Sequence, residues 1–370
     1  MPRPAEPEAT APGGGFVHTF LRGRVVFGAG SLNQVAAEVE ALGVRRALVV
    51  ATNSARDAAD VVEQQLGSRF AGRIDGVAQH VPTEVAEAAR AKSHEVDADA
   101  IVAIGGGSAI GLAKAMALTA TRTAEAGGGG VVVVAVPTTY AGSEMTPVWG
   151  ETAGGSKATG TDMRVLPRVV VYDPVLSRGL PLKVTAASVA NAVAHCVEAV
   201  WTPKADPITE MTAVEGLRAL SSGLRDVLVE PDDLGARERL LYGACLAGSA
   251  LATAGTGLHH KLCHLLGGTY NLPHAETHAA ILPQVTRVNA SSVPQAKARL
   301  EAALDTTDLA QSLFDLFQAA GVPTSLRELG LTEAQAAEAA AKFKPTDNPV
   351  RVTEDLVRGI LTRAWSGTRP

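Results

Sequence analysis

Four short apolar runs, rich in β-branched residues, alternate with helical patterns in the first 173 residues, and this alternation limits the fold most. Each run has the length of a buried strand. Strands that alternate with helices form parallel sheets, because each connection must cross back over one face of the sheet. The sequence therefore predicts an α/β domain. Its predicted strands are Ala47–Ala51, Ala100–Ile104, Val131–Val136 and Arg168–Tyr172.

The pattern changes after Pro174, where long Ala- and Leu-rich segments with helical periodicity follow and no convincing strand is found. We therefore expect an α/β domain over residues 16–173 and a helical domain over residues 174–370. In the first domain, the stretch from Ser31 to Gly43 predicts a covering helix with a serine N-cap. Residues 1–15, rich in Pro, Gly and Glu, are expected to be a disordered leader.

Composition excludes several classes of protein. The longest purely apolar run, Val131–Val136, is far shorter than the roughly 20 residues of a membrane helix. A net charge of -5 without a run of basic residues gives no surface for nucleic acid. Cys196, Cys245 and Cys263 are an odd number without CxxC spacing, which argues against disulfides and thiolate zinc sites. We expect a cytoplasmic protein with a small-molecule partner and neither a nucleic-acid nor a membrane partner.

A glycine-rich turn after the second predicted strand is the best candidate for a phosphate-binding site. Gly105, Gly106, Gly107 and Ser108 follow that strand directly and open a helical pattern. Backbone N–H groups at a helix start can bind a pyrophosphate, and the helix dipole adds to the attraction. The turn departs from GxGxxG, since Ile110 stands where the third glycine would be. A purely structural turn explains such a motif about equally well.

Two further loops after predicted strands carry candidate cofactor contacts. Thr138, Thr139 and Ser143 offer hydroxyls suited to ribose or nicotinamide at the carboxyl edge of a parallel sheet, although an ordinary polar loop is the alternative. Thr52 and Asn53 stand where NAD-binding folds often place an acidic residue. Because neither residue is charged, nothing repels a 2′-phosphate, and we expect both NADH and NADPH to be accepted.

The histidines gather in one part of the chain. Five of the nine lie within a single stretch of 22 residues. His260 and His264 are four residues apart in a helical context, so their rings lie on one face. Asn191 and His195 have the same spacing in a second predicted helix. We expect these side chains to point into one space, and His274, which follows a proline, to turn toward it.

Two interpretations of these histidines stay open. Imidazoles that converge from separate segments suit a metal ion. Asn191, however, supplies an amide where a carboxylate would bring negative charge, which favours a metal-free acid/base pocket without excluding an ion held by three imidazoles. A single histidine most often has a structural role, so the shared spacing is what indicates a site.

Five motifs carry a resemblance to a known family. They are GGGSAIGLAKAMAL, PTTYAGSEMTPVWG, YDPVLSRGLP, NAVAHCVEA and GLHHKLCHLLGGTYNLPHAETH, within a span from about Arg24 to the NPVRVTEDL segment. The chain resembles the iron-containing alcohol dehydrogenase superfamily and, within it, the maleylacetate reductases. This resemblance implies a Rossmann-like nucleotide-binding α/β domain, an all-α C-terminal domain and an active site in the cleft between them. We also expect a homodimer.

The resemblance also identifies a set of ligand positions. Metal-using relatives hold their ion with one Asp and three His, and these positions match Asn191, His195, His260 and His274. Asn replaces the Asp as it does in maleylacetate reductases, which implies catalysis with NADH or NADPH and no tightly bound metal. Val189 is a departure, because reductases of this group usually carry a glycine just before the Asn, and a bulkier side chain could reshape the pocket.

The reaction implied is the reduction of the conjugated C=C bond of maleylacetate, a dicarboxylate, to 3-oxoadipate during the degradation of aromatic compounds. Hydride would add to the alkene carbon β to the ketone. His195, His260 or His274 would then donate a hydrogen bond to the enolate oxygen. His264 or His259 would relay the second proton.

Two lysines complete the candidate residues, and three alternative functions stay open. Lys261 could attract the dianionic substrate, unless its neighbours turn it toward solvent, and Lys157 is a candidate cofactor contact. One alternative is a reductase of another enone or aldehyde in a biosynthetic pathway. The second is a non-redox lyase or cyclase of the dehydroquinate synthase type, which the superfamily resembles. The third is a silent ligand-binding paralogue, which the Val189 departure allows.

Overall fold

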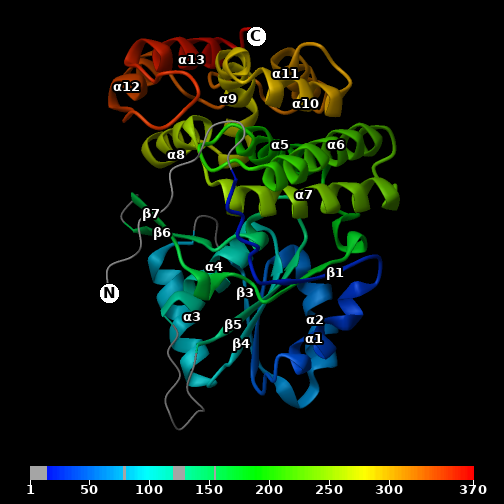
Figure 1. The fold of residues 1–370 in the computed structure, drawn as a ribbon. Helices are drawn as coiled ribbons and strands as arrows, with labels where there is room; N and C mark the ends of the chain where they lie inside the picture. Colours follow the sequence, from blue (N-terminus) through cyan, green and yellow to red (C-terminus); the bar gives the residue numbers. More distant parts are fainter. Residues whose placement is uncertain (1–14, 78–80, 120–129, 154–155) are drawn as a thin grey trace.

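The computed structural model describes residues 15–77, 81–119, 130–153 and 156–370 (Figure 1). The leader predicted over residues 1–15 lies outside the described residues except for Gly15. The described chain forms a sheet with helices on both faces, followed by a region made of helices only. This arrangement confirms the predicted fold class of an α/β part followed by an all-α part.

A six-stranded parallel sheet forms the first part, with the order β1-β8-β5-β4-β2-β3. All four predicted strands are present, whereas the two edge strands, β1 and β3, were not predicted. Each is partly exposed. β1 has only three consecutive apolar residues, and β3 is interrupted by polar residues, so neither has the longer apolar run that signals a strand buried on both faces. The strands are β1 (Arg24–Phe27), β2 (Ala47–Ala51), β3 (Phe70–Asp75), β4 (Ala100–Gly105), β5 (Val132–Pro137) and β8 (Val169–Tyr172).

Helices cover both faces of this sheet (Figure 1). Apolar residues of α1 and α2 pack on one face, and those of α3 and α4 pack on the other. Because α4 follows β4 directly, its N-terminus lies at the carboxyl edge of the sheet. The four helices are α1 (Val35–Ala41), α2 (Arg56–Leu66), α3 (Thr83–Glu95) and α4 (Gly107–Thr119).

The helix expected from Ser31 begins differently. A 3-10 turn, η1 (Ser31–Gln34), precedes α1. The Ser31 hydroxyl donates to the carbonyl oxygen of Tyr172 at 2.9 Å, so it ties this turn to the end of β8. The N-cap position is Gly30, which has no side chain, and the Asp173 carboxylate accepts the amides of Gly30 and Leu32 instead at 3.1 and 3.0 Å. The predicted serine N-cap is therefore wrong, because a tertiary hydrogen bond uses the hydroxyl.

An antiparallel hairpin between β6 (Val148–Ala153) and β7 (Ser156–Thr161) was not predicted either. It follows the loop that carries Thr138, Thr139 and Ser143, and β7 lies against helix α8. Lys157, a predicted cofactor contact, belongs to β7, but its side chain lies outside the described part of the structure.

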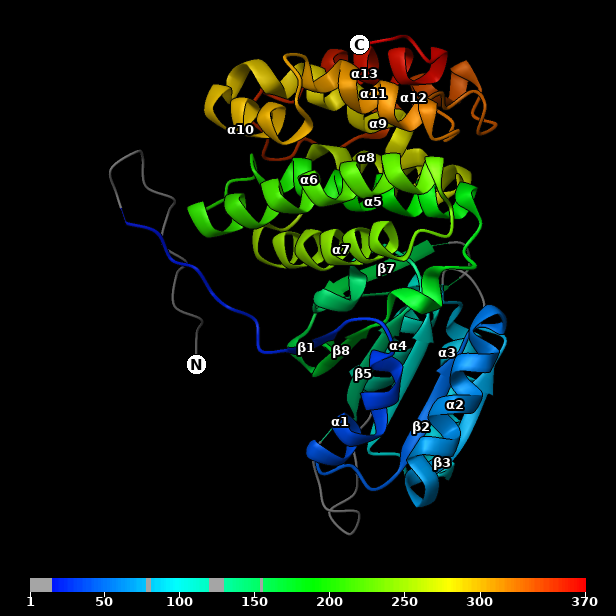
Figure 2. The same cartoon turned by 90° about the vertical axis from the view of Figure 1, so that its right-hand side faces the viewer.

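The second part consists of nine α-helices in residues 182–366, and residues 174–370, all described, contain no strand. Figure 2 shows α5, α6 and α7 as a layer between the sheet and the remaining helices. Within the described residues, no single helix is long and apolar enough to cross a membrane, although α7 and α8, bent by 99°, meet that length and composition as a pair. The helices are α5 (Leu182–Ala199), α6 (Pro207–Val229), α7 (Leu234–Ala254), α8 (Leu258–Tyr270), α9 (His274–Asn289), α10 (Pro294–Leu304), α11 (Leu309–Ala319), α12 (Glu333–Lys342) and α13 (Glu354–Ser366).

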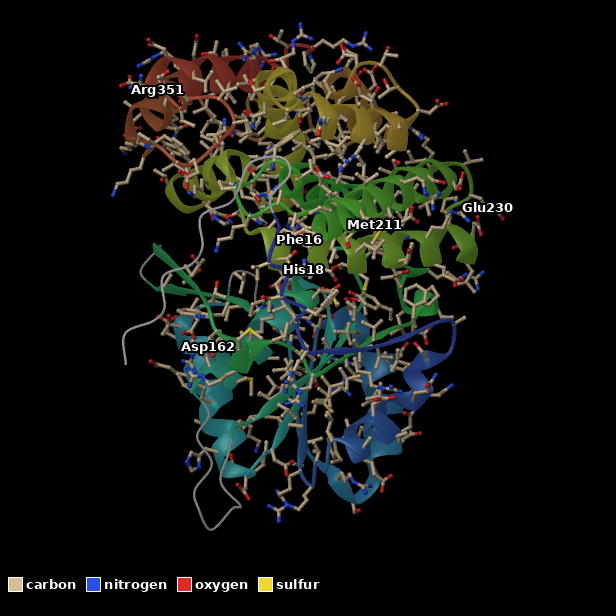
Figure 3. All side chains as sticks on the ribbon, in the orientation of Figure 1. Phe16, His18, Asp162, Met211, Glu230 and Arg351 are labelled. Carbon is tan, nitrogen blue, oxygen red and sulfur yellow. The ribbon has the colours of Figure 1, made fainter. Side chains whose placement is uncertain are left out.

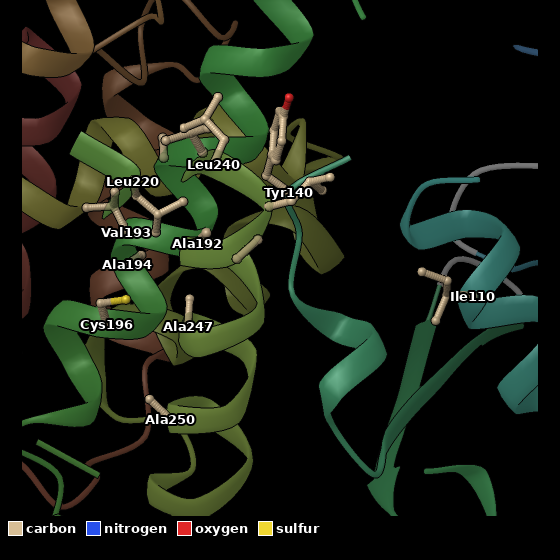
Figure 4. Packing of buried hydrophobic residues seen from close by; sticks show 14 of the residues in the cluster. Ile110, Tyr140, Ala192, Val193, Ala194, Cys196, Leu220, Leu240, Ala247 and Ala250 are labelled. Carbon is tan, nitrogen blue, oxygen red and sulfur yellow. The ribbon is translucent and has the colours of Figure 1, made fainter. Parts of the chain in front are cut away.

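One apolar core joins the two parts. A single cluster of buried side chains runs from α3 and α4 into α5, α6 and α7. Figure 4 shows its helical end, where Val193 and Cys196 of α5 lie beside Leu220 of α6. The helices approach closely, since a Cβ on Gly216 would lie 2.9 Å from the Cys196 sulfur. Val189 is fully buried in the same cluster, so it contributes to packing in the core.

The segment before β1 contacts the helical part. The His18 ring nitrogen Nδ1 lies 2.9 Å from the carboxylate of Asp206, which caps the start of α6. Figure 3 labels His18 and Phe16 on this segment. Phe16, Val17 and Phe20 are exposed. The expected homodimer stays a prediction.

Candidate active site

The carboxyl ends of β2, β4 and β5 bring several predicted cofactor residues together. Gly105 has φ +149°, and a Cβ there would lie 2.7 Å from Cγ2 of Thr52. A Cβ on Gly106 would lie 2.9 Å from Cγ2 of Thr139. The Thr138 amide donates to the Gly105 carbonyl at 3.0 Å. The glycines are therefore required, because two loops that bear threonines press against the turn before α4.

The other predicted cofactor residues surround this turn. Gly107 begins α4 and is exposed, and a side chain there would meet nothing within 4 Å. The backbone N–H groups at the start of α4 are thus next to open space, and a phosphate site requires this. Ser108 lies half-buried in the same turn, and Asn53 is exposed just beyond β2. Ser143 is half-buried at the start of a 3-10 turn, and its role stays a prediction.

A buried lysine holds the loop after β5. The Lys114 ammonium donates to the carbonyl oxygens of Ser143, Thr146 and Val148 at 2.6–2.9 Å. Burial lowers the pKa of Lys114 to about 7, although the nearby Glu144 opposes that shift. Lys114 and Glu144 lie in the first two sequence motifs but were not singled out. Their contacts fix the loop that also carries the predicted cofactor threonines.

This loop also contacts the helices directly. The Tyr140 amide donates to the Ser188 hydroxyl of α5 at 2.8 Å, three residues before Asn191. Gly142 packs against Gly248 of α7 so closely that a Cβ on Gly248 would lie 2.1 Å from the Gly142 carbonyl oxygen. The predicted cofactor edge and the helix that bears Asn191 are therefore neighbours.

Six imidazoles from three helices form one cluster. The rings of His195 and His260 stack with centroids 5.0 Å apart, so the two helices expected to converge do meet. His274 begins α9 after Pro273, and its ring stacks on that of His264 at 5.8 Å. The members are His195 on α5, His259, His260 and His264 on α8, and His274 and His278 on α9.

His278 lies at the centre of this cluster, although it was not predicted. Its ring centroid lies 4.6–4.8 Å from those of His259, His260 and His274. Its Nδ1 is 2.7 Å from Nε2 of His259, and its Nε2 is 3.3 Å from Nε2 of His274. The four-residue spacing from His274 could have identified it, because that spacing singled out His260 and His264.

A second residue missed from the sequence, Glu198, links α5 to the start of α8. Its carboxylate lies 2.5 Å from Nδ1 of His260 and accepts the His259 amide at 2.7 Å. Burial alone would raise the pKa of Glu198, but the attraction and hydrogen bond of His260 bring it to about 2. An ionised carboxylate only accepts, so Nδ1 of His260 carries the proton. The three-residue spacing from His195 was the available signal.

Three of the four family ligand positions each carry a buried polar atom that lacks a hydrogen-bond partner among the described residues. These atoms are Oδ1 of Asn191, Nδ1 of His195 and Nε2 of His260. Buried polar atoms in native proteins are nearly always paired. The three atoms therefore indicate a place where a bound polar molecule completes the hydrogen bonding.

The positions that the resemblance assigns to a metal do not fit an iron ion well as they stand. Asn191 gives the set no carboxylate to offset the charge of a divalent ion. Among the described residues, His195, His260 and His274 do not bring their donor atoms within 4.8 Å of one another. The trio that meets this distance lies elsewhere, at His259, Cys263 and His278, with all three side chains buried.

The remaining predicted residues differ in how far their side chains are buried. His264 is exposed and His274 half-buried, whereas His259 is fully buried and contacts His278. A relay through His259 would therefore pass through His278. Lys261 is exposed and donates to the Thr346 hydroxyl, and its role with substrate stays a prediction.

The buried rings predict a loss of stability in mild acid. Burial lowers the pKa of His259 to about 3 and those of His195 and His278 well below the usual value of 6.5. Below about pH 6.5 the unfolded chain therefore binds protons that the folded chain does not, at a cost of up to about 1.4 kcal/mol per pH unit for each ring. Glu198 adds to the loss as the pH falls from 4.5 toward 2. Urea unfolding at about pH 7.5, 6 and 5 tests this, and an unchanged free energy of unfolding would contradict it.

Comparisons with known proteins assign the family. A model described as iron-containing alcohol dehydrogenase matches residues 23–174, and one described as Fe-containing alcohol dehydrogenase family, C-terminal, matches residues 185–365. The chain belongs to the iron-containing alcohol dehydrogenase family. As a member of this family of oxidoreductases, it is an enzyme of that class. The domain boundary near Pro174 stays a prediction.

Several relatives within the iron-containing alcohol dehydrogenase family are maleylacetate reductases. Maleylacetate reductase 1 of Rhodococcus opacus is 44% identical over 96% of this chain and 98% of its own length. The maleylacetate reductase of Burkholderia cepacia is 44% identical over 94% and 97%, respectively. The crystal structure of the maleylacetate reductase from Agrobacterium tumefaciens superimposes with a TM-score of 0.90 at 41% identity, covering 96% of this chain and all of that one.

Proposed function

We propose that this enzyme reduces the conjugated C=C bond of maleylacetate to give 3-oxoadipate, with NADH or NADPH as the reductant, in the degradation of aromatic compounds. One observation carries the proposal: a chain 44% identical to a maleylacetate reductase over nearly its full length gathers six imidazoles beside the predicted cofactor edge. The substrate would lie between that edge and α5, α8 and α9.

The turn before α4 suits the cofactor. Side chains at Gly105 and Gly106 would collide with Thr52 and Thr139, so only glycines leave backbone amides accessible there. The start of α4 at Gly107 is open and offers the N–H groups and dipole that bind a pyrophosphate. When bound, the cofactor supplies the hydride that adds to the alkene carbon β to the ketone.

His260 and Glu198 act as a pair in this proposal. Since Nδ1 of His260 donates to Glu198, the outer nitrogen Nε2 is the atom that faces the reaction. When Nε2 carries a proton, the Glu198 carboxylate balances the charge of the ring. His260 can then donate to the ketone oxygen, where negative charge builds as the hydride arrives.

The one proton that the reaction consumes, which adds to the α carbon, would come from the outer histidines. His274 is half-buried, and its ring stacks on the exposed ring of His264, so the pair connects the cluster to solvent. His278 touches His274 from the inside at 3.3 Å. Because these rings lead from the buried cluster to the surface, the histidine that donates the proton can be reprotonated from solvent after each turnover.

No tightly bound metal is required in this proposal. The amide of Asn191 and the spread of the family-position histidines support it. We expect full activity after dialysis against EDTA, because hydrogen-bond donors stabilise the enolate. The rate of NADH oxidation with maleylacetate, before and after dialysis, measures this. If activity is lost on dialysis and Fe²⁺ or Zn²⁺ restores it, the enzyme depends on a metal and this prediction is wrong.

We also expect little preference between NADH and NADPH. Thr52 is half-buried and Asn53 is exposed at the end of β2, and neither carries a charge that would repel a 2′-phosphate. The values of kcat/KM for the two cofactors, measured with the same substrate, should therefore differ by less than about tenfold. A ratio well above tenfold in either direction contradicts this.

A spectrophotometric assay tests the function. Purified enzyme is mixed with NADH or NADPH and with maleylacetate, and in parallel with other small enones and aldehydes, each with and without EDTA. Oxidation that is fastest with maleylacetate supports the proposal. A higher kcat/KM for another enone or aldehyde rejects the proposed substrate, and no oxidation with any compound rejects a reductase.

A further inference from the structure

A compact trio of possible metal donors lies beside the family metal positions and is more completely buried than they are. His259 and Cys263 are four residues apart on α8, and His278 faces them from α9. Their donor atoms, Nε2 of His259, Sγ of Cys263 and Nδ1 of His278, all lie within 4.8 Å of one another. All three residues are fully buried. None of them occupies a position that the family resemblance assigns to a ligand.

We propose that His259, Cys263 and His278 form a second metal site, which binds a thiophilic transition-metal ion such as Zn²⁺. A thiolate and two imidazoles are a ligand set typical of zinc, and the soft sulfur selects against Mg²⁺ and Ca²⁺. The sequence had argued against a thiolate site, because Cys263 has no CxxC partner. The fold supplies the missing ligand from α9 instead.

The distances fit a site that opens slightly to admit the ion. Sγ of Cys263 is 3.7 Å from Nε2 of His259, close to the spacing of two ligands on one tetrahedral ion. The two nitrogens are 2.7 Å apart because they share a proton, whereas ligands of one zinc ion stand about 3.3 Å apart. The rings must therefore separate by roughly half an ångström.

The protons can be accounted for. Binding requires each neutral ring to carry its proton on the outer nitrogen, Nδ1 of His259 and Nε2 of His278, so only the ring that donates the shared proton changes its tautomer. Nε2 of His278 can then donate to Nε2 of His274, 3.3 Å away, which orients the ligand ring. The thiol of Cys263 loses its proton to solvent, so one proton is released for each ion bound.

The buried charges also balance. A divalent ion with one thiolate keeps a net charge of +1, which burial makes unfavourable. The Glu198 carboxylate accepts the His259 amide at 2.7 Å and so lies beside the site with a charge of -1. Ion, thiolate and carboxylate together are neutral.

The site should bind more weakly than a structural zinc site. Nδ1 of His259 has no hydrogen-bond partner among the described residues, and losing such a second contact weakens metal affinity by about 10- to 100-fold. The site has three protein ligands instead of four. We expect a dissociation constant in roughly the micromolar range.

Occupation of this site should inhibit the enzyme, and this consequence rests on the proposed function. A bound ion would fix the position and tautomer of His278, whose ring contacts those of His260 and His274. Both of these histidines are proposed to act on the substrate. A bound ion therefore opposes catalysis here, whereas in metal-using relatives of the family it supports catalysis.

Cobalt titration tests the site without any assay of activity. Co²⁺ bound to a thiolate gives an intense charge-transfer absorption in the near ultraviolet, which a site made only of imidazoles and amide cannot give. We expect this band in the wild-type enzyme, with saturation at one thiolate-bound Co²⁺ per chain. It should disappear in Cys263→Ser and persist in Cys196→Ser, a matched control with a buried thiol on α5.

Several outcomes would overturn the proposal. A wild-type enzyme that shows no thiolate band at millimolar Co²⁺ has no such site. A band that survives in Cys263→Ser, or vanishes in Cys196→Ser, places the thiolate elsewhere. Cys263→Ala is the second variant if serine is not tolerated, and circular dichroism checks that each variant is folded.

Inhibition is measured separately. Micromolar Zn²⁺ should slow NADH oxidation at least several-fold in the wild type, and the fractional inhibition should fall in Cys263→Ser. If maleylacetate is not reduced at all, the proposed function fails while the cobalt band still decides the metal site. If maleylacetate is reduced but the wild type gives no band, the metal site fails alone.

Discussion

Replacing His260 with alanine is expected to lower kcat by a factor on the order of 10² to 10³, the scale of losing one preorganised donor. The ring is buried, its Nδ1 is held by Glu198, and its Nε2 has no other partner among the described residues. Such a fixed ring contributes most when charge develops on the substrate, because no reorganisation is needed then. The effect should therefore appear in kcat more than in KM.

Steady-state kinetics with maleylacetate and NADH measure this loss. His94→Ala is the matched control, since His94 is exposed on α3, far along the chain from the cluster. An unchanged kcat with only a modest rise in KM would show that His260 does not touch the transition state.

Replacing Gly248 with alanine is expected to destabilise the folded enzyme by about 3 kcal/mol, near the upper end of overpacking effects. The new Cβ would lie 2.1 Å from the carbonyl oxygen of Gly142 and 2.9 Å from Cβ of Met145. The obstacle is backbone, which cannot rotate away as a side chain does. The loop after β5 must shift, and the predicted cofactor contacts of Thr138 and Thr139 shift with it.

Urea unfolding measures the loss of stability, and titration with NADH measures cofactor affinity. Gly268→Ala is the control, because Gly268 lies in helix α8 and a Cβ there would meet nothing within 4 Å. That variant should be neutral or more stable by roughly 0.5–1 kcal/mol. A Gly248→Ala variant that unfolds at the wild-type urea concentration would show that helix α7 and the loop are not in firm contact.

The central strands were predictable from the sequence, and the edges of the sheet were not. β2, β4, β5 and β8 are buried on both faces, so each must be a continuous apolar run. β1 and β3 are partly exposed and tolerate polar residues. The hairpin of β6 and β7 was missed for a similar reason, since the sequence ETAGGSKATG is polar and rich in small residues.

The sequence could predict those parts of the candidate site that depend on the spacing of residues within one helix or on the ends of neighbouring strands. The four-residue interval places His260 and His264 on one helix face, and a parallel sheet brings Thr52, Gly105 and Thr139 to one edge. Glu198 and His278 were missed, although their spacings from His195 and His274 are equally regular. Nothing local shows that an acidic residue on α5 meets the amide of His259 on α8.

The sequence alone determined the class of fold, and it was sufficient to predict a cofactor edge and the spacing of the histidines, because periodicity and glycine requirements are short-range properties of the chain. Tertiary structure alone decided which nitrogen of His260 carries the proton, which ring lies at the centre of the cluster and which three donors are close enough for an ion. Those properties depend on distances of a few tenths of an ångström between α5, α8 and α9. Only the packing of the three helices fixes such distances.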